Sequence, residues 1–131
     1  MNFSLQNSKN ISLEIGFGSG ENINYMLHNE SDSYFIGAEV YQNGIAKFLS
    51  NLDKNLYGRI KIFKNDFRIF LDNVPDNFFT RIIILYPDPW IKRRHRKRRI
   101  LNLENIEIFY RVIKSGGLIY VATDIKEYFK E

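Results

Sequence analysis

A glycine-rich segment near the start of the chain has the residue types and spacing of a ligand-binding turn. It reads LEIGFGSGEN over residues 13–22, with Glu14 two positions before Gly16, and with Gly18 and Gly20 following at alternate positions. Glycine tolerates positive φ angles and lets a ligand approach the backbone closely. A tight structural turn would explain the glycines alone equally well, so the interpretation depends on the residues around them.

The spacing of these glycines argues against a ligand that carries phosphate. A dinucleotide site needs G-x-G-x-x-G, and a P-loop ends in G-K-[ST]. Here Glu21 stands where the third glycine of the dinucleotide pattern would be. A carboxylate at the start of the predicted helix would also repel a pyrophosphate held by the helix dipole. A NAD-binding oxidoreductase is therefore disfavoured.

Two more acids end later strand-like segments. Glu39 closes YFIGAEV and Asp66 closes RIKIFKND. A carboxylate after the second strand can accept hydrogen bonds from both hydroxyls of a ribose, and Asp66 is placed to meet an adenine amino group. A phosphate-free nucleoside bound by acids suits S-adenosylmethionine, whose amino group and sulfonium are cationic. Either acid alone is more typical of a helix cap or a solvated loop, but together they favour a cofactor site.

A second unusual segment, LYPDPWIKRRHRKRRI, combines a fixed acid with a dense cationic run. Pro87 and Pro89 restrain the backbone on both sides of Asp88, and Trp90 offers a stacking face. Seven of residues 92–99 are Lys or Arg, and without them 12 basic residues face 15 acidic ones. A mildly acidic body with one cationic patch favours a polyanionic partner. A rigid turn beside a solvated charge run is the plainer alternative.

Alternating short apolar segments and longer amphipathic ones must position these residues. Helices are predicted over residues 21–30, 42–55, 67–74 and 101–117, the last of them stopped by a glycine pair, and strands over 11–16, 34–40, 59–66, 80–87 and 118–124. This alternation predicts one α/β domain over residues 1–131, with a mostly parallel five-stranded sheet and helices on both faces. In such a sheet the ligand lies at the carboxyl ends of the strands.

The same segments resemble bacterial tRNA (guanine-N7)-methyltransferases. The resemblance is carried by LEIGFGSGEN, GAEVYQNGI, the Asn-Asp pair at 65–66, YPDPWIKRRHRKRRI and GGLIYVATDIKEYF, in the family's order over nearly the whole chain. It implies a Rossmann-like class I methyltransferase sheet that lacks the family's usual C-terminal strands. It also implies transfer of a methyl group from S-adenosylmethionine to N7 of the guanine at position 46, in the variable loop of tRNA.

The family's functional residues can be carried over position by position. The cofactor-binding set would be Glu14, Gly16, Gly18, Gly20, Glu39, Asp66 and Asp88. Asp88 would also be the catalytic residue, either stabilising the charge that develops on the methylated guanine or holding the Watson–Crick edge of the base. The substrate would meet Lys92 and Asp124. The RNA backbone would meet Arg94, His95, Arg96, Lys97, Arg98 and Arg99.

Composition limits the setting and the alternatives. The chain has no cysteine, which excludes disulfides and thiolate metal sites, and no metal site is expected. It has no secretory signal and no apolar stretch near the roughly 20 residues of a membrane helix, so a cytoplasmic, membrane-free protein is expected. A catalytically silent RNA-binding remnant is the main alternative to an enzyme. A small-molecule methyltransferase would have no use for the cationic run, and the sequence leaves monomer and homodimer open.

Overall fold

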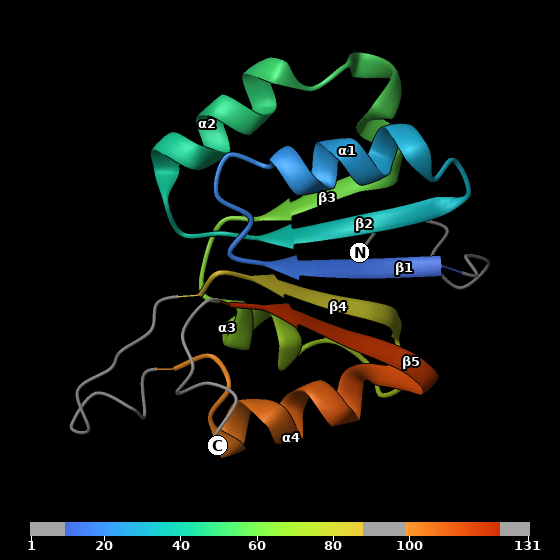
Figure 1. Cartoon of the computed structure of the whole chain (residues 1–131), viewed down its shortest axis with the longest axis vertical. Helices are drawn as coiled ribbons and strands as arrows, with labels where there is room; N and C mark the ends of the chain where they lie inside the picture. Colours follow the sequence, from blue (N-terminus) through green and yellow to red (C-terminus); the bar gives the residue numbers. More distant parts are fainter. Residues whose placement is uncertain (1–9, 88–98, 124–131) are drawn as a thin grey trace.

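The computed structural model describes residues 10–87 and 99–123, which form a single parallel sheet with helices on both faces (Figure 1). The strands are β1 (Asn10–Ile15), β2 (Ser33–Ala38), β3 (Ile60–Phe63), β4 (Phe79–Leu85) and β5 (Ile113–Ala122). The helices are α1 (Glu21–Asn29), α2 (Gln42–Asn51), α3 (Phe67–Leu71) and α4 (Leu103–Val112), with a 3₁₀ helix, η2 (Lys54–Arg59), before β3.

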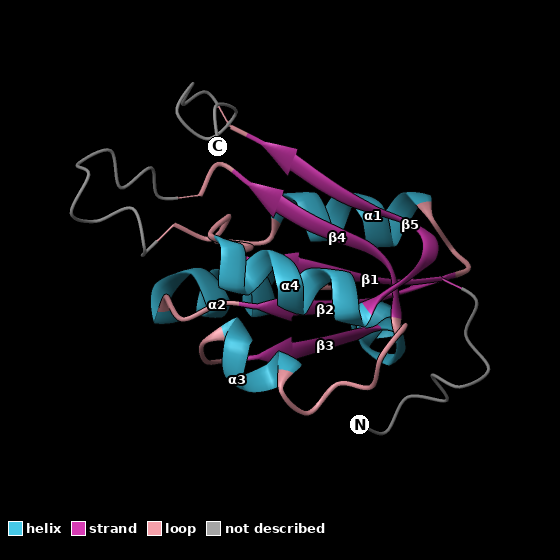
Figure 2. Cartoon of the chain, turned by 90° about the horizontal axis from the view of Figure 1, so that it is seen from below, coloured by secondary structure: helices cyan, strands magenta, loops and turns pink. Residues whose placement is uncertain are grey.

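The strands lie in the order β3-β2-β1-β4-β5, and every neighbouring pair is parallel. Because all five strands run the same way, their carboxyl ends meet at one edge of the sheet, as both views show (Figures 1 and 2). The predicted five-stranded parallel α/β fold is therefore confirmed.

Two hydrophobic cores hold the helices to the sheet. Successive strand residues point to opposite faces, so in β4 the side chain of Ile84 lies in the core with Leu71 of α3 and Phe109 of α4. The neighbouring Ile83 lies in the opposite core with Ile23 of α1. A strand apolar on both sides is typical of a covered central position, and β4 does lie between β1 and β5.

The last helix and strand differ from the sequence-based prediction. Helix α4 ends at Val112, and β5 begins at the next residue. Ile113 pairs with Phe79 and Leu118 with Arg81, so several residues of β5 bulge out opposite a two-residue step of β4. The glycine pair lies inside this irregularity, where Gly116 has a φ of 80°. The prediction that these glycines stop a helix was wrong. Ile113 is already buried against the core and paired with Phe79 of β4, so the helix has ended before the glycines.

One side of β5 remains open among the described residues. Leu118 and Tyr120 are 67% and 60% exposed. The alternate residues, Ile119 and Val121, pack against the core beneath α4. Strand β5 is also the end member of the sheet. Within residues 10–87 and 99–123, no helix is long and apolar enough to cross a membrane.

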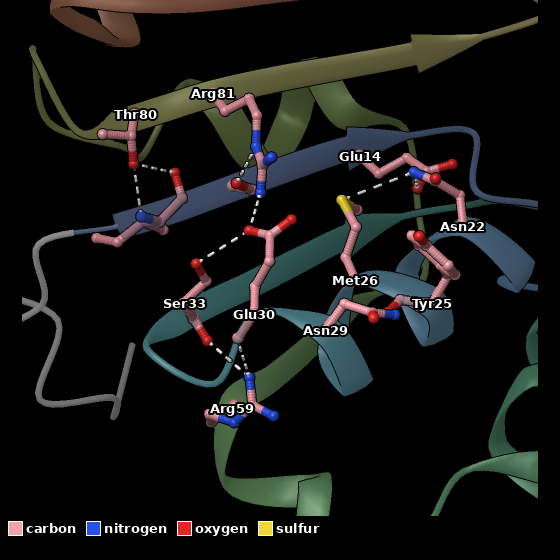
Figure 3. Close-up of polar contacts among 12 residues, drawn as sticks. Glu14, Asn22, Tyr25, Met26, Asn29, Glu30, Ser33, Arg59, Thr80 and Arg81 are labelled. Carbon is pink, nitrogen blue, oxygen red and sulfur yellow. Dashed lines mark hydrogen bonds and ion pairs between the residues drawn. The ribbon is translucent and has the colours of Figure 1, made fainter.

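Arg59 closes the C-terminal end of α1. Its guanidinium donates to the carbonyl of Glu30 at 2.9 Å and to that of Ser33 at 3.1 Å (Figure 3). It also donates to the carbonyl of Leu27. The last carbonyls of a helix have no partner within the helix. One side chain from η2 therefore satisfies the end of α1 and the start of β2 together.

The Arg59→Met variant is expected to unfold more easily, by about 2 kcal/mol, because charged hydrogen bonds to half-buried carbonyls are lost. Urea denaturation followed by circular dichroism would measure the free energy of unfolding. Lys54→Met, an exposed change in the same 3₁₀ helix, is the matched control. An equal loss in both variants would contradict a specific capping role for Arg59.

Candidate functional site

A cavity of about 430 Å³ opens at the carboxyl edge of the sheet, across the ends of four strands. Its lining includes Gly16 after β1, Glu39 after β2, Asp66 after β3, and Tyr86 and Pro87 after β4. Three residues that the sequence assigns to the cofactor therefore share one cavity, although 50 positions separate the first from the last. The cavity lies at the edge of the sheet where the sequence predicts the ligand site.

The glycine-rich turn requires glycine for both backbone shape and packing. Gly16, Gly18 and Gly20 have φ angles of 70°, 61° and 80°, in the left-handed region that side chains disfavour. A Cβ atom on Gly20 would lie 2.1 Å from a ring carbon of Phe48. Gly16, in contrast, has open space where its Cβ would be and lines the cavity. Steric crowding by Phe48 therefore adds a packing reason for glycine at Gly20, whereas Gly16 leaves open space at the cavity.

The carboxylate of Glu39 is fixed by the backbone. One oxygen accepts the amide of Gly18 at 2.7 Å, and the other accepts the amides of Val40 and Tyr41 at 2.8 and 3.0 Å. An ionised carboxylate has about four lone-pair positions, so these three bonds leave room for a further donor. The arrangement presents a charged acceptor at the cavity wall in a single orientation.

Asp66 combines two roles that the sequence could not separate. One carboxylate oxygen accepts the amide of Arg68 at 2.8 Å and caps α3, and the other accepts the guanidinium of Arg68, also at 2.8 Å. These hydrogen bonds hold the pKa of Asp66 below its usual value. Asp66 is thus a helix cap and, at the same time, a charged group in the cavity lining.

Glu14 does not line the cavity but is buried beside it, with 4% of its surface exposed. The side-chain amide of Asn22, from the first turn of α1, donates to it at 3.0 Å (Figure 3). Burial raises the pKa of Glu14 to about 7, and the charges of Glu21 and Glu39 add to the increase. The site therefore holds a carboxyl group whose ionisation would be favoured by a nearby cation.

Most of the predicted catalytic and RNA-binding residues fall outside the described residues. These are Asp88, Lys92, Arg94, His95, Arg96, Lys97, Arg98 and Asp124. Arg99 is described, and its side chain is fully buried at 0% exposure. An RNA contact needs a guanidinium at the surface, so the prediction for Arg99 does not fit.

Sequence reasoning missed two residues that shape the turn. A Cβ atom on Gly44 of α2 would lie 2.5 Å from the carbonyl oxygen of Gly18, so only glycine lets α2 pack this closely against the turn. Asn22 donates a hydrogen bond from its side-chain amide to the buried carboxyl group of Glu14. The signal for Gly44 was present, since a glycine inside a predicted helix usually has a packing or functional reason.

The chain matches a protein-family profile described as "Putative methyltransferase" over residues 8–131. The chain belongs to this methyltransferase family. A tRNA (guanine-N(7)-)-methyltransferase of Wolbachia pipientis wMel is 40% identical over 124 residues, which are 95% of this chain and 56% of that relative. A bifunctional methyltransferase of Rickettsia bellii is 42% identical over 130 residues, 99% of this chain and 23% of that relative. The chain thus spans about half or less of these relatives.

Solved methyltransferases share the fold at low sequence identity. The antibiotic-resistance methyltransferase Kmr superposes with a TM-score of 0.63 at 13% identity, covering 92% of this chain and 61% of its own. An antibiotic-related methyltransferase gives a TM-score of 0.64 at 16% identity, with coverages of 97% and 65%. These likenesses confirm the Rossmann-like methyltransferase sheet expected from the sequence.

Burial of Glu14 makes the stability of this methyltransferase domain depend on pH. Because its folded pKa of about 7 lies above the usual glutamate value of 4.5, stability falls as pH rises between the two values. Glu14→Gln removes the buried charge and is expected to stabilise the protein at pH 8 by about 2 kcal/mol, with little change at pH 4.5. Urea unfolding at both pH values measures this.

Glu21→Gln is the control, since Glu21 is exposed and its pKa is lowered rather than raised. It is expected to give no gain at pH 8. A Glu14→Gln protein as sensitive to pH over this interval as the wild type would contradict the assignment.

Gly44→Ala is expected to push α2 away from the turn, because the new methyl group would overlap the Gly18 carbonyl. Cofactor affinity should fall about tenfold or more, and unfolding should become easier by about 1–3 kcal/mol. Calorimetric titration and urea denaturation measure the two effects. Gly58→Ala is the control, because the added Cβ would meet no atom within 4 Å, and it should leave affinity unchanged. An equal effect at both positions would count against the packing argument.

Proposed function

We propose that this chain transfers a methyl group from S-adenosylmethionine to N7 of a guanine in tRNA. The observation that carries the proposal is the charge of the cavity. Glu39 and Asp66 line it, and none of its lining residues within the described part of the chain is Lys or Arg. Such a cavity suits a cationic, phosphate-free nucleoside rather than a nucleotide.

The residues present fit S-adenosylmethionine along the order of the strands. Asp66, after the outer strand β3, would accept the adenine amino group. Glu39, after β2, would accept a ribose hydroxyl in the lone-pair position that the three backbone amides leave open. Glu14, beside the turn, would be held ionised by the cationic amino group, which offsets the burial that raises its pKa.

The chemistry needs positioning more than proton transfer. When bound, S-adenosylmethionine supplies an electrophilic methyl group on a cationic sulfur. Guanine N7 carries a lone pair and no proton, so its bond to carbon can form while the carbon–sulfur bond breaks and the electron pair stays on sulfur. The guanine becomes cationic, and a nearby carboxylate stabilises that charge. We assign this carboxylate to Asp88, which is the next residue in the sequence after the cavity-lining Pro87.

The nucleic-acid substrate is inferred from the relatives and the cationic run. Several relatives at about 40% identity are named tRNA (guanine-N(7)-)-methyltransferase. With the buried Arg99 left out, residues 92–98 hold six Lys or Arg and begin five positions after Pro87 of the cavity wall. Phosphate contacts from such a run would orient RNA beside the methyl donor without reading its sequence. By family resemblance, the target is the guanine at position 46 in the variable loop.

The test is transfer of a radiolabelled methyl group to tRNA that lacks the modification, followed by nucleoside analysis for 7-methylguanosine. Asp88→Ala is expected to lower turnover by roughly 100-fold or more while cofactor binding, measured by calorimetry, stays within a few-fold. Asp72→Ala, which removes an exposed acid after α3, is the matched control.

The outcomes separate the alternatives. A wild-type chain that binds tRNA but transfers nothing would be a silent RNA-binding module. A methyl group found on another atom or base would overturn the assignment of N7. Normal turnover in Asp88→Ala would remove Asp88 from the mechanism.

A further inference from the structure

Tyr86 has a backbone conformation that its residue type disfavours. Its φ is 49°, in the left-handed region, where bulky side chains are rare. It also precedes Pro87, and residues before proline usually adopt an extended conformation. Left-handed backbone at a non-glycine residue persists only where the surrounding structure enforces it, and it occurs often at ligand sites.

The sheet enforces this conformation. The amide of Tyr86 donates to the carbonyl of Ala122, the last residue of β5, at 2.7 Å. This bond continues the pairing of β4 with β5 by one residue, just as the chain turns away from the sheet. The turn directs Tyr86 and Pro87 to the cavity wall.

The position of Tyr86 in the cavity differs from that of the other aromatic residue there. Phe67, beside Asp66 at the β3 end, is partly buried and packs against Phe109, with 5.8 Å between ring centroids. Tyr86 lies at the β4 end and is 69% exposed. The sheet order β3-β2-β1-β4 therefore separates a packed aromatic residue from an open one.

The acids that suit the cofactor lie after β2 and β3, which leaves the β4 end of the cavity to the methyl acceptor. We propose that Tyr86 is a substrate-binding residue whose exposed ring stacks on the target guanine. This inference rests on the proposed function. Bases that are unstacked from single-stranded loops are commonly received on aromatic side chains, and a left-handed, hydrogen-bonded residue would hold such a ring ready.

Two variants distinguish the contribution of the Tyr86 ring from that of its backbone conformation. Tyr86→Phe keeps the ring, and Tyr86→Asn removes it while retaining a residue type that tolerates the left-handed region. With tRNA as substrate, Tyr86→Phe should stay within about twofold of the wild-type kcat/KM, whereas Tyr86→Asn should lose roughly 10- to 100-fold, mainly through KM. Cofactor affinity by calorimetry and the thermal midpoint should change little in both.

The outcomes are distinguishable. Wild-type kcat/KM in Tyr86→Asn would overturn the stacking role and leave the proposed function intact. Equal losses in both variants, or a loss of cofactor affinity that matches the loss of kcat/KM, would also overturn it, because the ring would then not be what the acceptor needs. Absence of transfer by the wild-type chain would overturn the proposed function and this inference together.

Discussion

The hydrogen bond between the Gly18 amide and the Glu39 carboxylate joins the glycine-rich turn to the end of β2. Two parts of the cavity lining, Glu39 and Gly16, depend on this junction. It fixes the acid, and it fixes the turn that carries Gly16 into the cavity lining. Helix α2 packs against the same turn, because Gly44 lies close to the Gly18 carbonyl. A loop with glycine at three alternate positions would otherwise sample many conformations.

Two residues at or beside the cavity have an environment or a backbone conformation that their residue type disfavours. Glu14 is buried near other acids, and Tyr86 holds a left-handed backbone before a proline. Each feature makes the folded state less stable than it could be, and each lies at or beside the same cavity. Such departures are typical of functional sites, because a ligand or a substrate gains from groups that the protein alone would arrange differently. The rest of the described sheet, with its two apolar cores, supplies the stability that this edge lacks.

The sequence predicted what local patterns encode. Strand–turn–helix alternation placed Glu39 and Asp66 at strand ends, and the parallel sheet then brought them to one edge. It did not predict the start of β5, because the burial of Ile113 opposite Phe79 is a contact between distant segments. It also assigned Arg99 to an RNA contact, since a run of like charges does not show which of its members is buried.

Tertiary proximity explains the other residues that the patterns missed. A glycine inside the predicted helix signals a close contact at Gly44, but it does not reveal that the contact is a carbonyl of the turn. Nothing in the sequence around Asn22 reveals that it faces Glu14. Their roles depend on how α1 and α2 pack over the sheet. The roles expected of Asp88 and the cationic run remain predictions, because those residues lie outside the described ranges.

The hydrogen bond from Tyr86 to the last carbonyl of β5 ties the cavity to the margin of the described sheet. Terminal strands open locally more readily than central ones. Fraying of β5 would release the wall of the cavity while β1, β2 and β4 remain paired. Such local opening would change the cavity at temperatures where the helices are still folded, so spectroscopic melting curves that follow the helices alone would not detect it.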